Sequence, residues 1–339
     1  MSADFTVIGA RARGLQTRFF TRRELEDLAG LEHATLGRTL ARSPHFVEAP
    51  PETASALELE QATRRTAARH LGLLARWSDP TSPALEIFFA DQDRRNLRAL
   101  LRGAIQGAPA AERLAATVPT PTLPNRALVE LADLPTAAEV VGLLVVLSHP
   151  DARRLLPHAR QTGPELLELE LALAQGFAER ALAAARCGDA NLLRHVEHRI
   201  DVTNAQRALL LAGELRDVDA ERFFVEGGRA LPKPAFLQVA TAQPATAGGL
   251  LSKVLAGTDL AQLATDALGD PVRLEALWLR FELEQQRAAA RLDPLGSATV
   301  LQVLLRLLAQ SLDLRRLILG AAAGAPASTL RPGLVTPWN

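Results

Sequence analysis

Residues 96–110 read NLRALLRGAIQGAPA and residues 313–327 read DLRRLILGAAAGAPA, and nine of the fifteen aligned positions are identical. If the chain repeats at half of this separation, a third copy is expected near the midpoint. Asn204 lies there, almost midway between Asn96 and Asp313. These three residues therefore mark a threefold internal repeat, and this repeat determines the predicted organisation of the chain.

Other parts of the sequence recur at the same spacing. Leu123-Pro124 returns at this offset as Leu231-Pro232, and an apolar segment with helical character follows each pair. The matched offsets predict three units of about 108 residues, with the boundaries 1–125, 126–233 and 234–339. A repeat this long, used three times, predicts three similar helical bundles in a curved row rather than a short-period solenoid. Such a row has an inner surface, which is a physical reason to expect binding before catalysis.

Helical periodicity dominates the chain, and strand-type alternation bounded by turn residues is hard to find. The spacing Thr21-x-x-Glu24 is typical of a capping box at the start of a helix. Further along, a helix is expected from 299 to 319, with Gly320 placed to end it. Its apolar stripe consists of Leu301, Leu304, Leu305, Leu308 and Leu312. The predicted fold class is all-α.

The composition excludes several classes of protein. Among 339 residues, 38 Lys and Arg balance 38 Asp and Glu, so no net charge draws nucleic acid to the whole molecule. A single cysteine permits no internal disulfide. The start of the chain also lacks a secretory signal pattern, so we expect a cytoplasmic protein.

The sequence predicts no direct membrane span. Its longest apolar run is 140–147. A spanning helix needs about 20 apolar residues, so this run is far too short. We therefore expect a membrane connection only through another protein.

The sequence motifs of common catalytic and cofactor sites are missing. The chain contains no G-x-x-x-x-G-K-[ST] loop, no G-x-G-x-x-G after a strand, no H-E-x-x-H and no paired C-x-x-C knuckles. We therefore predict that the protein is not an enzyme and has no cofactor and no metal. An unrecognised hydrolase is the least favoured alternative.

A basic cluster precedes and follows the first repeat residue. It consists of Arg94, Arg95, Arg98 and Arg102. Arg94, Arg98 and Arg102 are spaced four apart, so their charges line one face of a helix. The simplest interpretation is a solvated face that Asp91 and Asp93 partly neutralise. The functional alternative is a docking surface for acidic loops of a partner. Nucleic acid is disfavoured, because no aromatic residue interleaves the cluster to stack on bases.

The repeated Asn96, Asn204 and Asp313 permit a structural or a functional interpretation. A short polar side chain that faces a neighbouring helix can bond its backbone and fix the register of each bundle. We favour this structural role for all three residues.

Three stretches of the chain resemble one known family. Residues 7–29, VIGARARGLQTRFFTRRELEDLA, are similar to an opening A-R-x-R-x-L helix, a short break and a second helix. Residues 199–231, RIDVTNAQRALLLAGELRDVDAERFFVEGGRAL, resemble the family's D-x-x-N helix and its Gly-Gly loop. Residues 293–335, DPLGSATVLQVLLRLLAQSLDLRRLILGAAAGAPASTLRPGLV, resemble its closing N-L-R-x-I-x-x-G helix. The family is that of the C subunit, also called the d subunit or AC39, of V/A-type rotary ATPases.

The closing helix departs from the family pattern. Leu307, Gln310 and Asp313 stand where the family has Lys, Glu and Asn, whereas Arg315 and Gly320 match. The charged belt of this helix is therefore reduced in the present chain.

The resemblance implies an all-α, three-domain, funnel-like subunit that does no chemistry itself. Such a subunit is a rotor adaptor between the central-shaft subunits and the membrane-embedded ring, and it couples ATP hydrolysis or synthesis to proton or sodium transport. It would be cytoplasmic and peripheral to the inner or plasma membrane through the ring. The candidate docking residues are Arg94, Arg98, Arg102 and Arg315. The alternative function is a free cytoplasmic helical scaffold that binds another protein.

Overall fold

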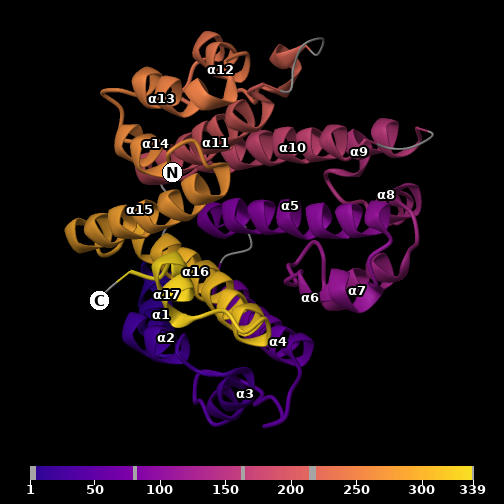
Figure 1. The fold of residues 1–339 in the computed structure, drawn as a ribbon, viewed down its shortest axis with the longest axis vertical. Coiled ribbons are helices and arrows are strands. Elements are labelled where there is room, and N and C mark those ends of the chain that lie inside the picture. Colours follow the sequence, from indigo (N-terminus) through magenta and orange to yellow (C-terminus); the bar gives the residue numbers. More distant parts are fainter. Residues whose placement is uncertain (1–4, 79–81, 162–164, 214–218, 338–339) are drawn as a thin grey trace.

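The structure is a computed structural model that describes residues 5–78, 82–161, 165–213 and 219–337 (Figure 1). Within these ranges the chain forms seventeen α-helices and two short 3-10 helices, and no strand. The prediction of an all-α fold is confirmed. No helix in these ranges has both the length and the apolar character needed to cross a bilayer.

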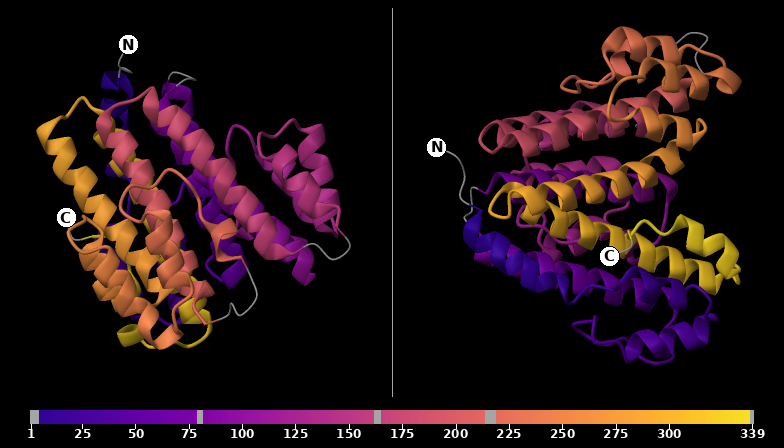
Figure 2. Two further views of the ribbon diagram at one scale, coloured as in Figure 1. Left: turned by 90° about the horizontal axis from the view of Figure 1, so that it is seen from above. Right: turned by 90° about the vertical axis from the view of Figure 1, so that its left-hand side faces the viewer.

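Long helices form the framework, and in Figure 2 they run roughly side by side. There are six in the described part of the chain: α4 (Ala56–Trp77), α5 (Pro83–Gln106), α10 (Leu166–Arg186), α11 (Ala190–Leu211), α15 (Pro271–Leu292) and α16 (Ser297–Ala322). The three repeat-marking residues lie on α5, α11 and α16, which we call the central helices.

Shorter helices occupy the periphery. They are α1 (Thr6–Gln16), α2 (Arg22–Leu28), α3 (His33–Ala41), α6 (Ala110–Ala115), α7 (Asn125–Asp133), α8 (Ala137–Val146), α9 (Ala152–Ala159), α12 (Lys233–Ala240), α13 (Pro244–Val254), α14 (Ala261–Ala267) and α17 (Ala327–Leu330), with the 3-10 helices η1 (Ala220–Phe223) and η2 (Arg331–Gly333). In Figure 1 the group α12–α13 lies at the top, α6–α9 at the right and α3 at the bottom.

Local sequence signals start and end these helices. At the start of α2, the hydroxyl of Thr21 accepts from the backbone N–H of Glu24 while the Glu24 carboxylate accepts from the Thr21 backbone, so the predicted capping box is confirmed. Equivalent boxes begin α4 and α8. After two of the central helices, Gly107 and Gly324 adopt φ values of 68° and 70°. Glycine takes this left-handed conformation without the steric cost that a side chain would bring.

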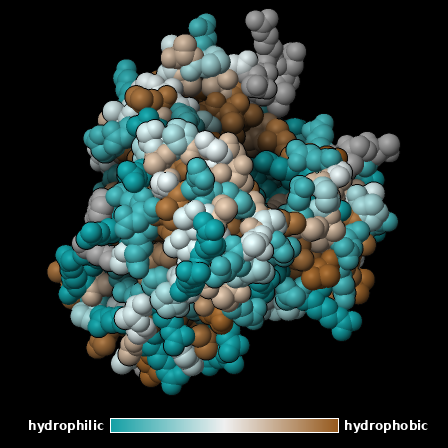
Figure 3. All heavy atoms as spheres, turned by 60° about the horizontal axis from the view of Figure 1, so that its bottom comes forward, coloured by the Kyte–Doolittle hydropathy of each residue, from teal (hydrophilic) through white to brown (hydrophobic). Residues whose placement is uncertain are grey.

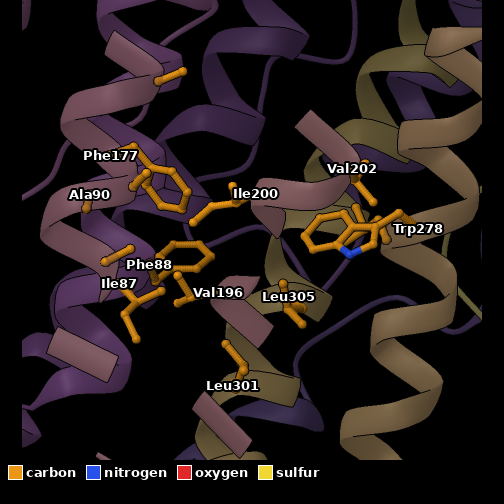
Figure 4. Close-up of a cluster of buried hydrophobic side chains, with 14 of the residues drawn as sticks. Ile87, Phe88, Ala90, Phe177, Val196, Ile200, Val202, Trp278, Leu301 and Leu305 are labelled. Carbon is orange, nitrogen blue, oxygen red and sulfur yellow. The ribbon is translucent and has the colours of Figure 1, made fainter. Parts of the chain in front are cut away.

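The largest hydrophobic core lies between the long helices (Figure 4). Phe88 of α5, Phe177 of α10, Val196 of α11, Trp278 of α15 and Leu305 of α16 all belong to it. Each fully buried side chain of this size contributes about 1.5–3 kcal/mol through removal of apolar surface from water. Ala67, Leu71 and Leu74 of α4 belong to it as well, so the core joins six long helices from all parts of the chain.

Two smaller cores are built around the ends of the central helices. One combines residues 97–173 from α5 and α7–α10. The other combines residues 20–62 with residues 314–334, so the first helices of the chain pack on the last long one. The first of these cores contains residues on both sides of position 125. The division of the chain into 1–125, 126–233 and 234–339 stays a prediction about the repeat.

Asn96 and Asn204 make the same contact in two parts of the molecule. The side-chain amide of Asn96 donates to the carbonyl of Val118 over 2.7 Å and accepts from the same residue's N–H over 2.9 Å. The amide of Asn204 bonds both backbone groups of Val225, over 2.8 and 3.0 Å. Both asparagine side chains are fully buried. Each one therefore ties a central helix to the segment that follows it along the chain.

Asp313 makes the corresponding contact in the third copy. Its two carboxylate oxygens accept from the backbone N–H groups of Val335 and Thr336, over 2.7 and 2.8 Å. A carboxylate has no hydrogen to donate, so it bonds two N–H groups where asparagine bonds one N–H and one carbonyl. We call these three contacts the backbone clamps.

The residue three positions before each clamp residue is also buried, and its side chain accepts hydrogen bonds. Asp93 accepts from the hydroxyls of Thr120 and Thr122. Asp201 accepts from three successive backbone N–H groups at residues 229–231. Gln310 accepts from the backbone N–H of Phe20 over 2.7 Å. In the third copy the bonded segment therefore comes from the beginning of the chain.

The clamps predict a measurable loss of stability when one is removed. In Asn204→Ala, the buried N–H and carbonyl of Val225 both lose their partner. We therefore expect the free energy of unfolding to fall by about 3 kcal/mol. Urea unfolding followed by circular dichroism measures this change.

Gln238→Ala, at an exposed position of α12, is the matched control. Its stability should differ from that of the wild type by less than about 0.5 kcal/mol. Equal stability of the two variants would contradict the structural role of the clamp.

Candidate interaction surface

A hollow opens where α5, α11, α15 and α16 approach one another. It consists of three adjoining cavities of about 630, 580 and 300 Å³, which share Val272 and Glu275 near the start of α15. We use the word hollow for these three cavities together. Asn96 and Asn204 line none of these cavities, whereas Asp313 lines the second one together with Val335, the residue that it bonds.

The structure brings the four candidate docking arginines to this hollow. Arg98, Arg102 and Arg315 line the largest cavity, although the last of them comes from the distant end of the chain. Arg94 lines the smallest cavity together with Arg98 and Arg102. The side chains of Arg98, Arg102 and Arg315 are 43, 43 and 47% exposed, whereas that of Arg94 is only 10% exposed. Arg94 is thus a buried member of the group and the other three form its accessible part.

Each of these arginines has a carboxylate partner. Arg98 and Arg102 share Glu170 of α10, at 3.0 and 2.7 Å. Arg315 pairs with Glu60 of α4 at 2.7 Å. The pKa of Glu60 is nevertheless raised, because its burial outweighs the attraction of the arginine. Partly exposed pairs of this kind contribute little stability, so they leave the arginines able to exchange partners.

Asp91 and Asp93 were expected to neutralise part of the basic cluster, but of the two only Asp91 pairs with arginines of that cluster. Asp91 lies 2.6 Å from Arg94. Asp93 is fully buried and is occupied by the hydroxyls of Thr120 and Thr122. The interpretation of Asp93 as a solvated neutralising charge is therefore wrong, because this residue belongs to the bonding that holds the segment after α6.

Further charged residues complete the floor of the hollow. The sequence already places Arg95 in the basic cluster, whereas Arg199 and Glu275 were not among the candidate docking residues. Arg95 of α5 bonds both Asp91, at 2.9 Å, and Glu275 of α15, at 3.2 Å. Arg199 of α11 reaches the same Glu275 at 3.3 Å. Its guanidinium also lies 4.7 Å from the centre of the Trp278 ring. This network connects α5, α11 and α15 through side chains that are far apart in the sequence.

One sequence signal could have found part of this set. An arginine follows each clamp residue by two or three positions: Arg98, Arg207 and Arg315. On a helix, a step of two residues turns the side chain by about 200°, so Arg98 and Arg315 point away from the clamp residue, whereas a step of three keeps Arg207 nearer to its side. All three arginines line cavities of the hollow. Arg199 has no such repeat signal.

The electrostatics of the floor follow from burial and crowding. Burial alone would raise the pKa of Glu275, but Arg95 and Arg199 outweigh it and hold this pKa at about 2. Burial and neighbouring arginines lower the pKa of Arg199 to about 10, although Asp91 and Glu275 oppose the shift. Burial together with Arg94 and Arg98 likewise lowers the pKa of Arg207 to about 10. The arginines remain charged at neutral pH in spite of mutual repulsion.

Apolar side chains are exposed along the same hollow. Leu210, Val272, Leu312 and Leu319 line its cavities and are 61, 72, 37 and 42% exposed. The prediction that Leu312 belongs to the buried stripe of α16 is wrong, while Leu301, Leu304 and Leu305 of that stripe are buried. The face drawn in Figure 3 is mostly hydrophilic, with separate hydrophobic patches. Exposed apolar residues next to charged ones are typical of protein contact surfaces.

No metal centre is found in the described ranges, since no three His, Cys, Asp or Glu side chains there are arranged to hold an ion. The hollow also contains no grouping of a nucleophile with a general base among the described residues that line it. Its chemistry is that of arginine pairs, carboxylates and exposed apolar surface. This combination is typical of a surface that binds another protein.

Comparison with known families shows which family the chain belongs to. The family model described as ATP synthase (C/AC39) subunit matches residues 8–332. The chain therefore belongs to this family, the C or d subunits of V/A-type ATPases. A search of curated proteins finds no match. The protein is accordingly a subunit of an ATPase complex.

The low pKa of Glu275 predicts a specific dependence of stability on pH. This pKa is about 2 in the folded protein against an ordinary value of 4.5, so the unfolded chain binds more protons between these values. The stabilisation from Glu275 is fully present above about pH 4.5 and is lost as the pH falls towards 2. In Glu275→Gln, we expect lower stability at pH 6 and a smaller further loss between pH 4.5 and 3.

Urea unfolding at pH 6, 4.5 and 3 measures this difference. Glu130→Gln on α7, which removes a carboxylate from an exposed ion pair, is the control and should retain the wild-type slope. If the stability of Glu275→Gln falls with pH as steeply as that of the wild type, the network does not hold Glu275 ionised.

Proposed function

We propose that this subunit is a noncatalytic rotor adaptor of a V/A-type ATPase. In this role it links the central-shaft subunits to the membrane-embedded ring and couples ATP hydrolysis or synthesis to proton or sodium transport. Membership of the ATP synthase (C/AC39) family supports the assignment to the complex. The observation that carries the adaptor role is the hollow, where accessible arginines lie beside exposed apolar side chains.

The hollow suits the end of a shaft that is acidic and partly apolar. Arg98, Arg102 and Arg315 give long-range attraction and orientation, because opposite charges steer encounter and fix register. Leu210 and Val272 provide exposed apolar area, whose burial contributes most of the affinity. A shaft placed here would contact α5, α11, α15 and α16 at once. Torque would then reach all three repeats together.

An adaptor that transmits torque must also be stiff. The large core joins six long helices, and the clamps fix the segments that follow the central helices. We infer that the three repeats form a curved, funnel-like row around the hollow and that the protein is held at the membrane through the ring. Cytoplasmic location at the inner or plasma membrane belongs to the same proposal.

Charge reversal at the accessible arginines tests the docking surface. The double variant Arg98→Glu and Arg102→Glu would place two more carboxylates beside Glu170 and repel an acidic shaft. We expect the amount of shaft and catalytic head retained on washed membranes to fall several-fold at low salt, with a weaker salt dependence than in the wild type. Immunoblots and ATPase assays of the washed membranes measure both.

Arg126→Glu, at a 92% exposed position of α7, is the matched charge-reversal control and should leave retention unchanged. Circular dichroism of both purified chains checks that each is folded. Wild-type retention in the folded double variant would move the shaft contact away from this hollow. If affinity purification from solubilised membranes recovers no ATPase subunits with the wild-type chain, the scaffold alternative replaces the adaptor.

A core substitution tests the need for stiffness. Leu305 is 3% exposed in the large core. Leu305→Asp would therefore bury an unpaired carboxylate at a cost of several kcal/mol, comparable with the stability of a whole domain. We expect vesicles with this variant to lose ATP-driven ion pumping while ATPase activity persists in the released soluble head. Leu295→Asp, at a 61% exposed position before α16, is the control and should pump normally. Normal pumping by Leu305→Asp would contradict the adaptor role.

A further inference from the structure

Around the smallest cavity of the hollow, arginines outnumber carboxylates by two to one. We call this group the arginine junction; its members are Arg94, Arg95, Arg98, Arg102, Arg199 and Arg207, with Asp91, Glu170 and Glu275. Six positive charges face three negative ones, which leaves a formal excess of three. The junction joins α5, α10, α11 and α15.

Every carboxylate of the junction is already shared. Asp91 pairs with two arginines of α5, Glu170 pairs with Arg98 and Arg102, and Glu275 pairs with residues of α5 and α11. Arg207 has no carboxylate within salt-bridge distance among the described residues. Its guanidinium donates to the main-chain oxygens of Phe223 and Glu170, at 3.3 and 3.2 Å. The positive charge of Arg207 is thus not balanced by a paired carboxylate among the described residues.

Several donors in the junction have no hydrogen-bond partner within the described structure. Nε and Nη1 of Arg199 are buried without such a partner, and so is Nε of Arg102. The Arg199 side chain is only 3% exposed, and its contacts with Trp278 and Glu275 hold it in place. Buried donors without a partner cost free energy, and a charged donor costs more than a neutral one. A bound acceptor would remove this cost.

Repulsion among the crowded arginines also favours a bound anion. The pKa values of Arg199 and Arg207 are both lowered to about 10, by burial first and by neighbouring arginines in addition. An anion bound among these arginines would attract each of them and offset their mutual repulsion.

The size and depth of the cavity select the kind of anion. Its volume is about 300 Å³, and small-ligand sites begin at about this size. Arg94 and Arg199 lie at its floor with 10 and 3% exposed side chains, below the more exposed Arg98 and Arg102. A protein helix is too wide to reach this floor, whereas a small anion reaches it. Gln206 adds an uncharged polar group to the wall.

We propose that the arginine junction binds a small multivalent phosphate anion, either inorganic pyrophosphate or the diphosphate group of a nucleotide. Guanidinium groups present paired N–H donors that match phosphate oxygens, and three negative charges would balance the junction. This site shares Arg98 and Arg102 with the surface assigned to the shaft, but its deeper members Arg199 and Arg207 lie outside that surface, and the proposal does not depend on the adaptor role. An anion bound there would screen Arg98 and Arg102 and weaken docking of an acidic partner.

Isothermal titration of the purified full chain with pyrophosphate tests the site, in phosphate-free buffer at neutral pH. We expect one saturable site per chain. Arg207→Gln removes a charge without breaking a salt bridge, and we expect it to weaken binding at least tenfold. Arg126→Gln, on exposed α7, is the control and should bind as the wild type does. Circular dichroism and thermal melting confirm that the variants fold.

A gain-of-function variant separates binding from folding. Glu170→Gln removes a carboxylate that competes for Arg98 and Arg102, so we expect pyrophosphate to bind several-fold more tightly. Loss of structure cannot produce tighter binding. A parallel titration with ADP distinguishes the two sources, because tighter binding of ADP than of pyrophosphate identifies a nucleotide as the ligand.

Three outcomes would overturn the proposal. The first is the absence of saturable binding of either anion to the wild-type chain. The second is equal loss of binding in Arg207→Gln and Arg126→Gln, which would mean adventitious surface binding only. The third is binding of an oligoglutamate peptide, but of neither phosphate anion, that Arg207→Gln abolishes; the junction would then serve protein docking alone. None of these results bears on whether the subunit is a rotor adaptor.

Discussion

The structure depends on one repeated interaction, in which a buried polar side chain of a central helix bonds the backbone of a segment further along the chain. These segments are not helical where they are bonded, so their N–H and carbonyl groups need partners once they are buried. Asn96, Asn204 and Asp313 supply these partners. The side chain also fixes the path of the chain after it leaves a central helix.

This constraint lies next to the candidate interaction surface. Asp313 and the clamped residues Val118 and Val335 line cavities of the hollow, and the arginines two or three positions beyond the clamp residues line them too. Glu170 and Glu275, which balance part of their charge, come from α10 and α15 and therefore from other parts of the chain. The hollow combines incompletely balanced charge with exposed apolar residues. Such an arrangement costs stability, and a core large enough to join six long helices can tolerate it.

The sequence was sufficient to predict what depends on local spacing and on repetition. Helical class, the capping box at Thr21 and the position of Asn204 followed from such patterns. Pairings between distant helices could not be predicted, because nothing in the sequence marks Glu170 as the partner of Arg98. Leu312 was placed in the buried stripe because its spacing fits, but its neighbours in space form a cavity instead of a core. Arg199 was missed for the same reason, since its role arises from three helices that meet there.

The third copy differs from the other two in a way that its surroundings explain. Asparagine at the first two clamps satisfies one N–H and one carbonyl, whereas Asp313 bonds two N–H groups and leaves nearby carbonyls to another donor. Arg22 of α2 takes that role and donates to the carbonyls of Leu334 and Thr336. Burial raises the pKa of Asp313, and the backbone bonds and the charge of Arg22 oppose this effect. The departure from the family's asparagine is therefore coupled to the first helices of the chain, which pack against the third copy and complete its bonding.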